Sequence, residues 1–224
     1  MINKAMIWRK RRAGICPADF VHRVESKQAP LVARVPGVTR YIQSFTLPQA
    51  YARGEPAYDC VEELEFGSQR ELEAAGQSPH WEAFIDDNRD LFNEASSLIL
   101  AVEVHLAKSG RTNADMVKGM QLVNARENLS VDGFETYWHD VHGPIAARIP
   151  TLIRYEQNST RQMASISSST VYQGVAVTWF ESTKTMKVGV DTPEYTALRA
   201  DEPNLISATL APYLITKETL SIRP

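Results

Sequence analysis

The chain has 224 residues, of which 43% are hydrophobic and 23% are charged, and its formal net charge is −3. These values are ordinary for a globular protein with a real core, and they give no global field that would favour nucleic acid or an acidic membrane. Cys16 and Cys60 provide neither a disulfide framework nor zinc-ligand spacing. Neither a signal peptide nor a membrane-spanning apolar run is found, so we expect a cytoplasmic protein.

In chain order, the first distinctive segment is the basic run Arg9-Lys10-Arg11-Arg12. We interpret this run as a solvated loop, with a phosphate-binding patch as the alternative. Strands are predicted over "YDCVEELEF" (58–66) and "SSLILAVEVHL" (96–106), and a junction near "SGRTNAD" (109–115).

The second half of the chain shows its elements more clearly. A short apolar strand is predicted at 118–125, and a helical pattern runs from Phe134 to about Arg148. Further on, the patterns predict strands over 152–158, 171–180 and 213–222, and a helix over either 182–190 or 193–199. The order is therefore β-α-β-β-α-β, which is the ferredoxin-like arrangement.

The two halves are copies of one unit. Shifting the sequence by 114 residues places Pro30 on Pro144, since 144 − 30 = 114. Eight positions between 20 and 43 are then identical, where about one or two would match by chance. The pairs are Phe20/Phe134, Pro30/Pro144, Ala33/Ala147, Arg34/Arg148, Pro36/Pro150, Arg40/Arg154, Tyr41/Tyr155 and Gln43/Gln157. The sequence thus predicts an α+β chain of two tandem ferredoxin-like units, residues 1–110 and 111–224.

The second copy carries a recognisable motif. Phe134, Tyr137-Trp138 and His142-Gly143-Pro144 resemble the signature of EthD-domain proteins, which belong to the dimeric α/β-barrel superfamily. The first copy keeps the matching phenylalanine and proline, but it has Gln28 for the histidine and Ala29 for the glycine. Only the second copy therefore has the complete motif.

The resemblance implies that two ferredoxin-like units form a barrel from facing sheets, so that one chain supplies the pseudo-dimer that relatives make by dimerising. Whether two chains pair further is left open. It also implies a small-molecule substrate. Relatives of this architecture include polyketide dehydratases and cyclases, lactone isomerases and cofactor-independent monooxygenases, while some barrel relatives bind haem.

Helical geometry places the motif residues around the helix. An α-helix turns by about 100° per residue around its axis. On such a helix Phe134, Val141 and Ile145 lie on the same side as Trp138 and form an apolar stripe with it. His142 falls at the border of this stripe, and His139 falls nearer to solvent. The geometry predicts that His142 faces a cavity between the helix and the sheet.

Two interpretations of His142 follow. An imidazole has an unperturbed pKa of about 6.5 and moves protons in either direction at neutral pH, so His142 is our candidate general acid or base. The alternative is a boundary histidine that caps the last turn of the helix. Spacing alone favours the cap, and the family resemblance favours the catalytic role.

His139 and His142 make a weaker case for a metal. Their i, i+3 spacing suits two ligands, but zinc needs a third, and the other histidines, including His105, lie in the first copy. We therefore predict no metal and interpret His139 as a surface residue.

Further site residues come from the following strands and from the comparison of the copies. Tyr155 either packs between core residues or donates to a substrate oxygen, and Gln157 lies on the same face. Tyr137 and Trp138 are unique to the second copy, as His142 is. Thr178 and Trp179 are predicted to line the cavity, with core packing as the alternative for Trp179.

The sequence thus predicts an enzyme without a cofactor that uses His142 for proton transfer, assisted by Tyr137 and Tyr155. Substrate-binding residues would be Trp138, Gln157, Thr178 and Trp179. Dehydration, cyclisation or isomerisation of an oxygenated aromatic, polyketide or lactone-like molecule fits this set. Cofactor-free oxygenation and non-catalytic ligand binding remain as alternatives.

Overall fold

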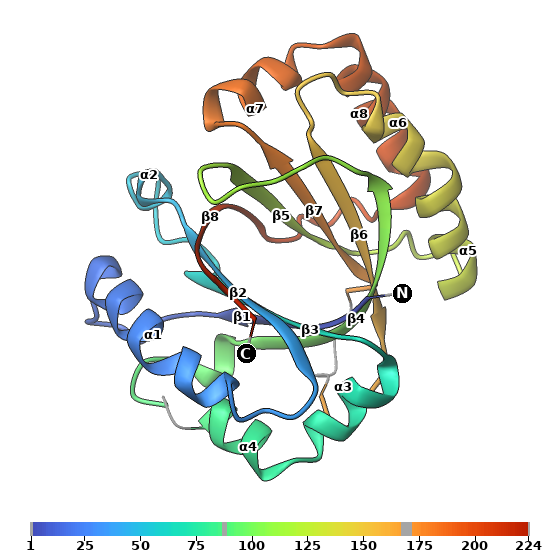
Figure 1. Ribbon diagram of the computed structural model, residues 1–224. Coiled ribbons are helices and arrows are strands. Elements are labelled where there is room, and N and C mark those ends of the chain that lie inside the picture. Colours follow the sequence, from blue (N-terminus) through green and yellow to red (C-terminus); the bar gives the residue numbers. More distant parts are fainter. Residues whose placement is uncertain (1, 87–88, 167–171, 224) are drawn as a thin grey trace. The chain divides into compact units, whose positions relative to one another are not determined.

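The computed structural model describes residues 2–86, 89–166 and 172–223, and Figure 1 shows how the elements follow one another along the chain. The chain divides into two compact units. Unit 1 comprises Met1–Glu103, Arg161–Ser169 and Glu218–Pro224, and unit 2 comprises Val104–Thr160 and Thr170–Lys217. This division falls inside three strands, at residues 103/104, 160/161 and 217/218, whereas the repeat boundary predicted from the sequence lies between residues 110 and 111.

Unit 1 contains the first set of helices and strands. Its elements are β1 (Asn3–Arg9), α1 (Pro17–Val32), β2 (Val38–Thr46), α2 (Pro48–Tyr51), β3 (Cys60–Phe66), α3 (Gln69–Gly76), α4 (Pro79–Asp86), η1 (Glu94–Ser96) and the first part of β4 (Leu98–Lys108). Strands β3 and β4 are those predicted at 58–66 and 96–106. Figure 1 shows α1, α3 and α4 on one side of β1, β2 and β3.

Unit 2 repeats this order. Its elements are β5 (Val117–Val123), α5 (Val131–Tyr137), the π-helical turn η2 (Trp138–His142), α6 (Gly143–Ala147), β6 (Arg154–Arg161) except its last residue, β7 (Gly174–Phe180), α7 (Thr183–Val190), α8 (Pro193–Leu205) and the first part of β8 (Tyr213–Ile222). Both segments proposed for the second helix are helical, as α7 and α8. Each has its own cap, because the Ser182 hydroxyl accepts from the N–H of Thr185 and the Thr192 hydroxyl from that of Tyr195.

The strands pair in the ferredoxin-like order in each unit. β1 lies between β3 and β4, and β3 also pairs with β2; in unit 2, β5 lies between β7 and β8, and β7 also pairs with β6. All of these pairs are antiparallel. Along the whole chain the strand order β1-β3-β2-β8-β5-β7-β6-β4 closes as a barrel. The predicted fold class, an α+β chain of two tandem ferredoxin-like units in an α/β barrel, is confirmed.

The repeat extends to strand register and helix caps. Gln43 faces Glu62 across β2 and β3, and Gln157 faces Ala176 across β6 and β7, so both partners are related by 114 residues. Ser68 caps α3 in unit 1 as Ser182 caps α7 in unit 2. Differences between the two units therefore come from side chains on a shared backbone plan.

The basic run at residues 9–12 is more ordered than a solvated loop. Arg9 is the last residue of β1 and is 2% exposed, and its Nε donates a hydrogen bond to Glu62 at 3.0 Å. Lys10 and Arg11 both pair with the buried carboxylate of Asp59. These carboxylates neutralise most of the run, so the structure favours neither the solvated loop nor a phosphate-binding patch.

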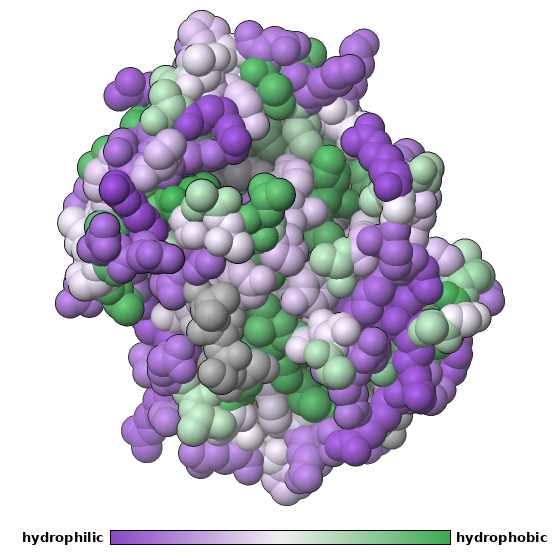
Figure 2. Space-filling model, turned by 180° about the vertical axis from the view of Figure 1, so that it is seen from behind, coloured by the Kyte–Doolittle hydropathy of each residue, from purple (hydrophilic) through white to green (hydrophobic). Residues whose placement is uncertain are grey.

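The outer surface mixes residue types. On the face drawn in Figure 2, hydrophobic side chains lie in separate patches among hydrophilic ones, as is usual for exposed protein surface. Among the residues that the structure describes, no helix is both long enough and apolar enough to cross a bilayer.

Phe84 is a sensitive probe of the unit 1 core. Its fully buried ring makes edge contacts with Tyr41 at 6.3 Å and with Trp81 at 6.0 Å between ring centroids. We expect Phe84→Ala to lower the free energy of unfolding by about 3–5 kcal/mol, because the truncation leaves a cavity. Leu210→Ala is the control, since Leu210 is 98% exposed and its truncation should change stability by less than about 0.5 kcal/mol. Urea unfolding of both variants measures the difference.

Candidate active site

A buried carboxylate that the sequence analysis did not select lies at the centre of the candidate site in unit 2. Asp201, on α8, is 9% exposed and accepts hydrogen bonds from the Tyr137 hydroxyl at 2.6 Å and from the Asn204 amide at 3.3 Å. Its other oxygen lies 2.8 Å from Nδ1 of His142. The carboxylate therefore joins α8 to the helical segment that carries the EthD-like motif.

The ionised carboxylate of Asp201 determines which ring nitrogen of His142 carries the proton. Burial raises the pKa of the Asp201 carboxyl, but the hydrogen bonds from Tyr137, His142 and Asn204 outweigh that effect and lower the pKa. The carboxylate is then an acceptor only, so Nδ1 of His142 carries the shared proton. Nε2 is left as the nitrogen that can exchange a proton with a bound molecule.

Tyr137 is fixed by the same carboxylate. The pKa of its phenol is raised, chiefly by the hydrogen bond to Asp201 and secondly by burial. A phenol held in its protonated form acts as a hydrogen-bond donor, and here it donates to Asp201. Tyr137 therefore supports the histidine–carboxylate pair.

A second network lies on the sheet side of the motif. The Tyr155 hydroxyl accepts from Nε1 of Trp138 at 3.0 Å and from the Gln157 amide at 3.4 Å. Burial raises the pKa of Tyr155 to about 12, so its hydroxyl stays protonated at neutral pH. In both hydrogen bonds the Tyr155 oxygen is the acceptor, and no described residue accepts its proton, which is left for a bound molecule.

A π-helical turn sets the position of His142. Within η2 the backbone N–H of Gly143 donates to the carbonyl of Trp138, five residues earlier, and the Gln157 amide donates to the same oxygen at 2.6 Å. The wider turn changes the phase of the helix. Val141, predicted to join the apolar stripe, is 40% exposed, whereas His142 is only 8% exposed. The stripe prediction was wrong at Val141, because it assumed an uninterrupted α-helix.

Gly143 leaves room for this arrangement. A Cβ at this position would lie 2.8 Å from Nε2 and 3.0 Å from Oε1 of the buried Gln157. In unit 1 the corresponding residue is Ala29, α1 is a continuous helix, and Gln43 reaches the carbonyl of Val24 only at 3.4 Å. The π turn thus accompanies glycine in unit 2, and the continuous α-helix accompanies alanine in unit 1.

The remaining predicted residues divide between the two faces of the sheet. Thr178 pairs directly with Tyr155 and so shares its face, where its hydroxyl donates to the carbonyl of Gly119 at 3.2 Å. Trp179, the next residue along β7, points to the opposite face. There its ring lies under Lys118, at 5.2 Å from Nζ. The structure therefore groups Tyr137, Trp138, His142, Tyr155 and Gln157, with Thr178 on the same face and Trp179 apart.

His139 is half-buried, where the sequence predicted a surface residue. Its ring stacks on that of His105, with 4.1 Å between the centroids, and Nε2 lies 3.4 Å from the Ser159 hydroxyl. Within residues 2–86, 89–166 and 172–223, no three His, Cys, Asp or Glu side chains are grouped as metal ligands.

Asp201 was missed because it lies 59 residues after His142 on another helix. The repeat does contain a signal, since 201 − 114 = 87 and residue 87 is also aspartate. However, residues shared by the two copies are expected to belong to the scaffold, so this identity by itself argues against a functional role. Asp87 itself lies outside the described residues.

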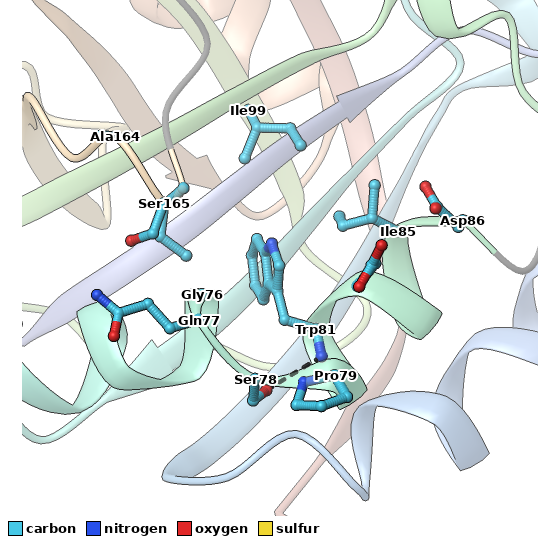
Figure 3. A pocket seen from close by; sticks show the side chains of 12 residues that line it. Gly76, Gln77, Ser78, Pro79, Trp81, Ile85, Asp86, Ile99, Ala164 and Ser165 are labelled. Carbon is cyan, nitrogen blue, oxygen red and sulfur yellow. Dashed lines mark hydrogen bonds between the residues drawn. The ribbon is translucent and has the colours of Figure 1, made fainter.

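Unit 1 has a hollow of its own, shown in Figure 3. It measures about 490 Å³ and lies between α3 and α4, where Trp81, Ile85 and Ile99 meet the carboxylates of Glu82 and Asp86. The Trp81 backbone N–H donates to the Ser78 hydroxyl at its edge. Its described lining contains no histidine, and the hollow is not part of the site in unit 2.

Comparison with known proteins adds the family and the fold. The model of the EthD domain matches the chain twice, over residues 12–96 and 126–209. No curated protein matches the chain significantly.

Several solved structures share the fold at low sequence identity. One is an anthrone oxidase-like protein, with a TM-score of 0.72 and 7% identity, covering 99% of this chain and 92% of its own. A provisionally named monooxygenase from Lactobacillus acidophilus NCFM has a TM-score of 0.59 and 10% identity, with 99% and 96% covered. A variant chlorite dismutase from Candidatus Nitrospira defluvii has a TM-score of 0.58 and 11% identity, with 98% and 92% covered.

Gly143→Ala tests the role of the π turn. Alanine ordinarily favours a helix over glycine by about 1 kcal/mol, but here the new Cβ displaces the Gln157 amide, so we expect a loss of about 1–3 kcal/mol in unfolding free energy. We also expect the imidazole NMR signals of His142 to move. The matched control is Ala29→Gly in unit 1, which should cost about 0.5–1 kcal/mol and leave those signals unchanged. Equal effects on the His142 signals would contradict this role of Gly143.

Asp201→Asn tests the charge of the central carboxylate. Because the pKa of Asp201 is lowered in the fold, its charge stabilises the folded chain above the unfolded pKa of about 3.9, and this contribution is lost as pH falls through the folded pKa. Wild type should therefore be more stable than Asp201→Asn at pH 7, and the difference should shrink in acid. Thermal unfolding between about pH 3 and 7 measures it. Asp140→Asn, at an exposed position in the same segment, should show no such difference.

Proposed function

Because the chain belongs to the EthD family, we propose that unit 2 is a proton-transfer enzyme acting on a small oxygenated molecule, with His142 as the general base and acid. The observation that carries the proposal is the hydrogen-bonded series Tyr137–Asp201–His142. A carboxylate bound to Nδ1 holds the imidazole in one tautomer and directs the lone pair of Nε2 outward. This arrangement favours a base over a helix-capping histidine.

The chemistry follows from the two networks. Nε2 of His142 would take a proton from a carbon next to a carbonyl, and Tyr155 would donate a hydrogen bond to the carbonyl oxygen as it gains negative charge. In a dehydration, the protonated imidazole would return the proton to a departing hydroxyl, which leaves as water. In an isomerisation, the proton would return to another carbon of the same molecule. Neither reaction consumes an oxidant.

A cofactor-free oxygenation is the second candidate, and the anthrone oxidase-like neighbour favours it. The same base would form a carbanion from an electron-rich aromatic CH₂ group, and the carbanion would react with O₂. One oxygen atom would enter the product as a carbonyl and the other would leave as water, with the substrate carbon supplying the four electrons. The two candidates share His142 and differ in oxygen uptake.

The test begins with a thermal-shift screen of hydroxylated aromatic, polyketide and lactone compounds against the wild-type chain, followed by turnover measurements on those that bind. We expect His142→Ala to lower turnover by about 10²–10⁴-fold, the usual contribution of a positioned acid or base, while its circular dichroism remains that of wild type. An oxygen electrode distinguishes the candidates, because only oxygenation consumes O₂ with the substrate.

The matched control is His22→Ala, which removes an exposed histidine from α1 in unit 1. This variant should retain wild-type turnover. Undiminished turnover by His142→Ala would contradict the proposal. Tight binding of a compound that is never converted, and whose affinity does not depend on pH near the imidazole range, would instead support a non-catalytic ligand carrier.

A further inference from the structure

The hollow between α3 and α4 of unit 1 is lined by segments that are distant in sequence. Trp81 and Ile85 lie one helical turn apart on α4, and Ile99 of β4 completes an apolar lining with them. Another wall is formed by Ser165 and Ile166, which follow β6. At about 490 Å³, the hollow has the size of a site for a small molecule.

Gly76, the last residue of α3, lets the segment after β6 come close. A Cβ at this position would lie 2.3 Å from Cδ1 of Ile166 and 2.9 Å from the carbonyl oxygen of Ser165. The corresponding residue of unit 2 is Val190, since 76 + 114 = 190. The glycine therefore belongs to the construction of the hollow in unit 1 and is not demanded by the shared fold.

Two polar groups of the lining have no hydrogen-bond partner within the described part of the chain. Trp81 is only 6% exposed, yet its indole Nε1–H donates to none of the described residues. Figure 3 shows this nitrogen at the edge of the ring that points toward Ile99, which also lines the hollow. The hydroxyl oxygen of Ser165 is buried and likewise unpaired among residues 2–86, 89–166 and 172–223. Since enclosed polar groups are ordinarily paired, both point to a bound molecule that supplies the partner.

The charged side chains of the lining are all acidic. Glu82 and Asp86 lie one turn apart on α4, and no described lining residue is basic. Asp86 is paired with Arg89 at 2.8 Å, whereas Glu82 has no ion pair among the described residues. A carboxylate beside the Trp81 indole favours an organic cation, because both the carboxylate and the face of the ring attract positive charge.

Unit 2 lacks this combination of residues. At the positions of both carboxylates it has uncharged residues, Thr196 and Ala200. Ile85 is replaced by Arg199, which is 59% exposed and pairs with Glu202. The shared fold therefore does not require the two carboxylates, and the acidic lining is a property of unit 1 alone.

We propose that the hollow of unit 1 is a second ligand site, which binds a small organic ammonium ion. The ammonium group pairs with Glu82, and the apolar body of the molecule lies on Trp81 and Ile85. An oxygen of the molecule accepts the hydrogen bond of the Trp81 indole. Binding here involves no covalent step and does not depend on the proton transfer proposed for unit 2.

Tyramine is the probe, because it combines an ammonium group, an aromatic ring and a hydroxyl. Its aliphatic amine is protonated at neutral pH. The chain has four tryptophans, whose indole N–H groups give separate signals in a proton–nitrogen NMR spectrum, and Trp81→Phe identifies the signal of Trp81. We expect tyramine to move this signal with a Kd of about 1 mM or tighter. The signal of the fully buried Trp8 should stay in place.

Two variants test the charge of the hollow. Glu82→Gln keeps the size of the side chain and should weaken tyramine binding about 2- to 5-fold, the usual effect of an exposed ion pair. Ile85→Arg introduces the residue found in unit 2 and should weaken binding at least about 10-fold, because it places a cation beside the ammonium group. Glu73→Gln is the matched control, since Glu73 is exposed on α3 and does not line the hollow. This control should bind tyramine as wild type does.

Tyrosol separates charge from shape, because it is tyramine with an alcohol in place of the ammonium group. Wild type should bind tyrosol at least about 3-fold more weakly than tyramine, and Glu82→Gln should not change the affinity for tyrosol. Equal affinity for the two compounds, equal effects of Glu82→Gln and Glu73→Gln, or an unmoved Trp81 signal at about 10 mM tyramine would overturn the proposal. Circular dichroism of each variant checks that its fold is intact.

Discussion

The arrangement of unit 2 depends on how one buried carboxylate is satisfied. Asp201 is nearly enclosed, and an ionised group in such a place persists only if donors surround it. Tyr137, His142 and Asn204 supply those donors. Meeting this requirement joins α8 to the motif-bearing segment and fixes which nitrogen of His142 is free. Which nitrogen of His142 can exchange a proton is thus a consequence of the hydrogen bonds that the buried carboxylate requires.

The π turn is the backbone counterpart of this constraint. The Trp138 carbonyl accepts from both Gly143 and Gln157, which holds the turn open and brings His142 onto the buried side of the helix. Glycine at 143 is required by the close approach of the Gln157 amide. Turns of this kind occur frequently at functional sites, because they turn one side chain away from the regular helical phase.

The two copies of the unit pair the buried polar groups between helix and sheet in different ways. In unit 1 the polar layer between helix and sheet is satisfied internally, by Arg9 and Tyr41 around Glu62. In unit 2 the positions that correspond to Glu62 and Arg9 carry no charged side chain. The Tyr155 hydroxyl there donates its proton to none of the described residues. Since the backbone register is the same, a few side-chain changes are enough to separate a scaffold from a candidate site.

The sequence by itself determined the two-copy organisation, the ferredoxin-like order and the EthD family, because repeats and strand periodicity are local properties that survive without contacts. It also selected His142, Tyr137 and Tyr155, which the structure places in two adjoining networks. Only the tertiary structure brought Asp201 to His142, replaced the regular helix by a π turn and put Trp179 on the opposite face from Tyr155. Each of these depends on contacts between residues distant in sequence, and local periodicity carries no record of them.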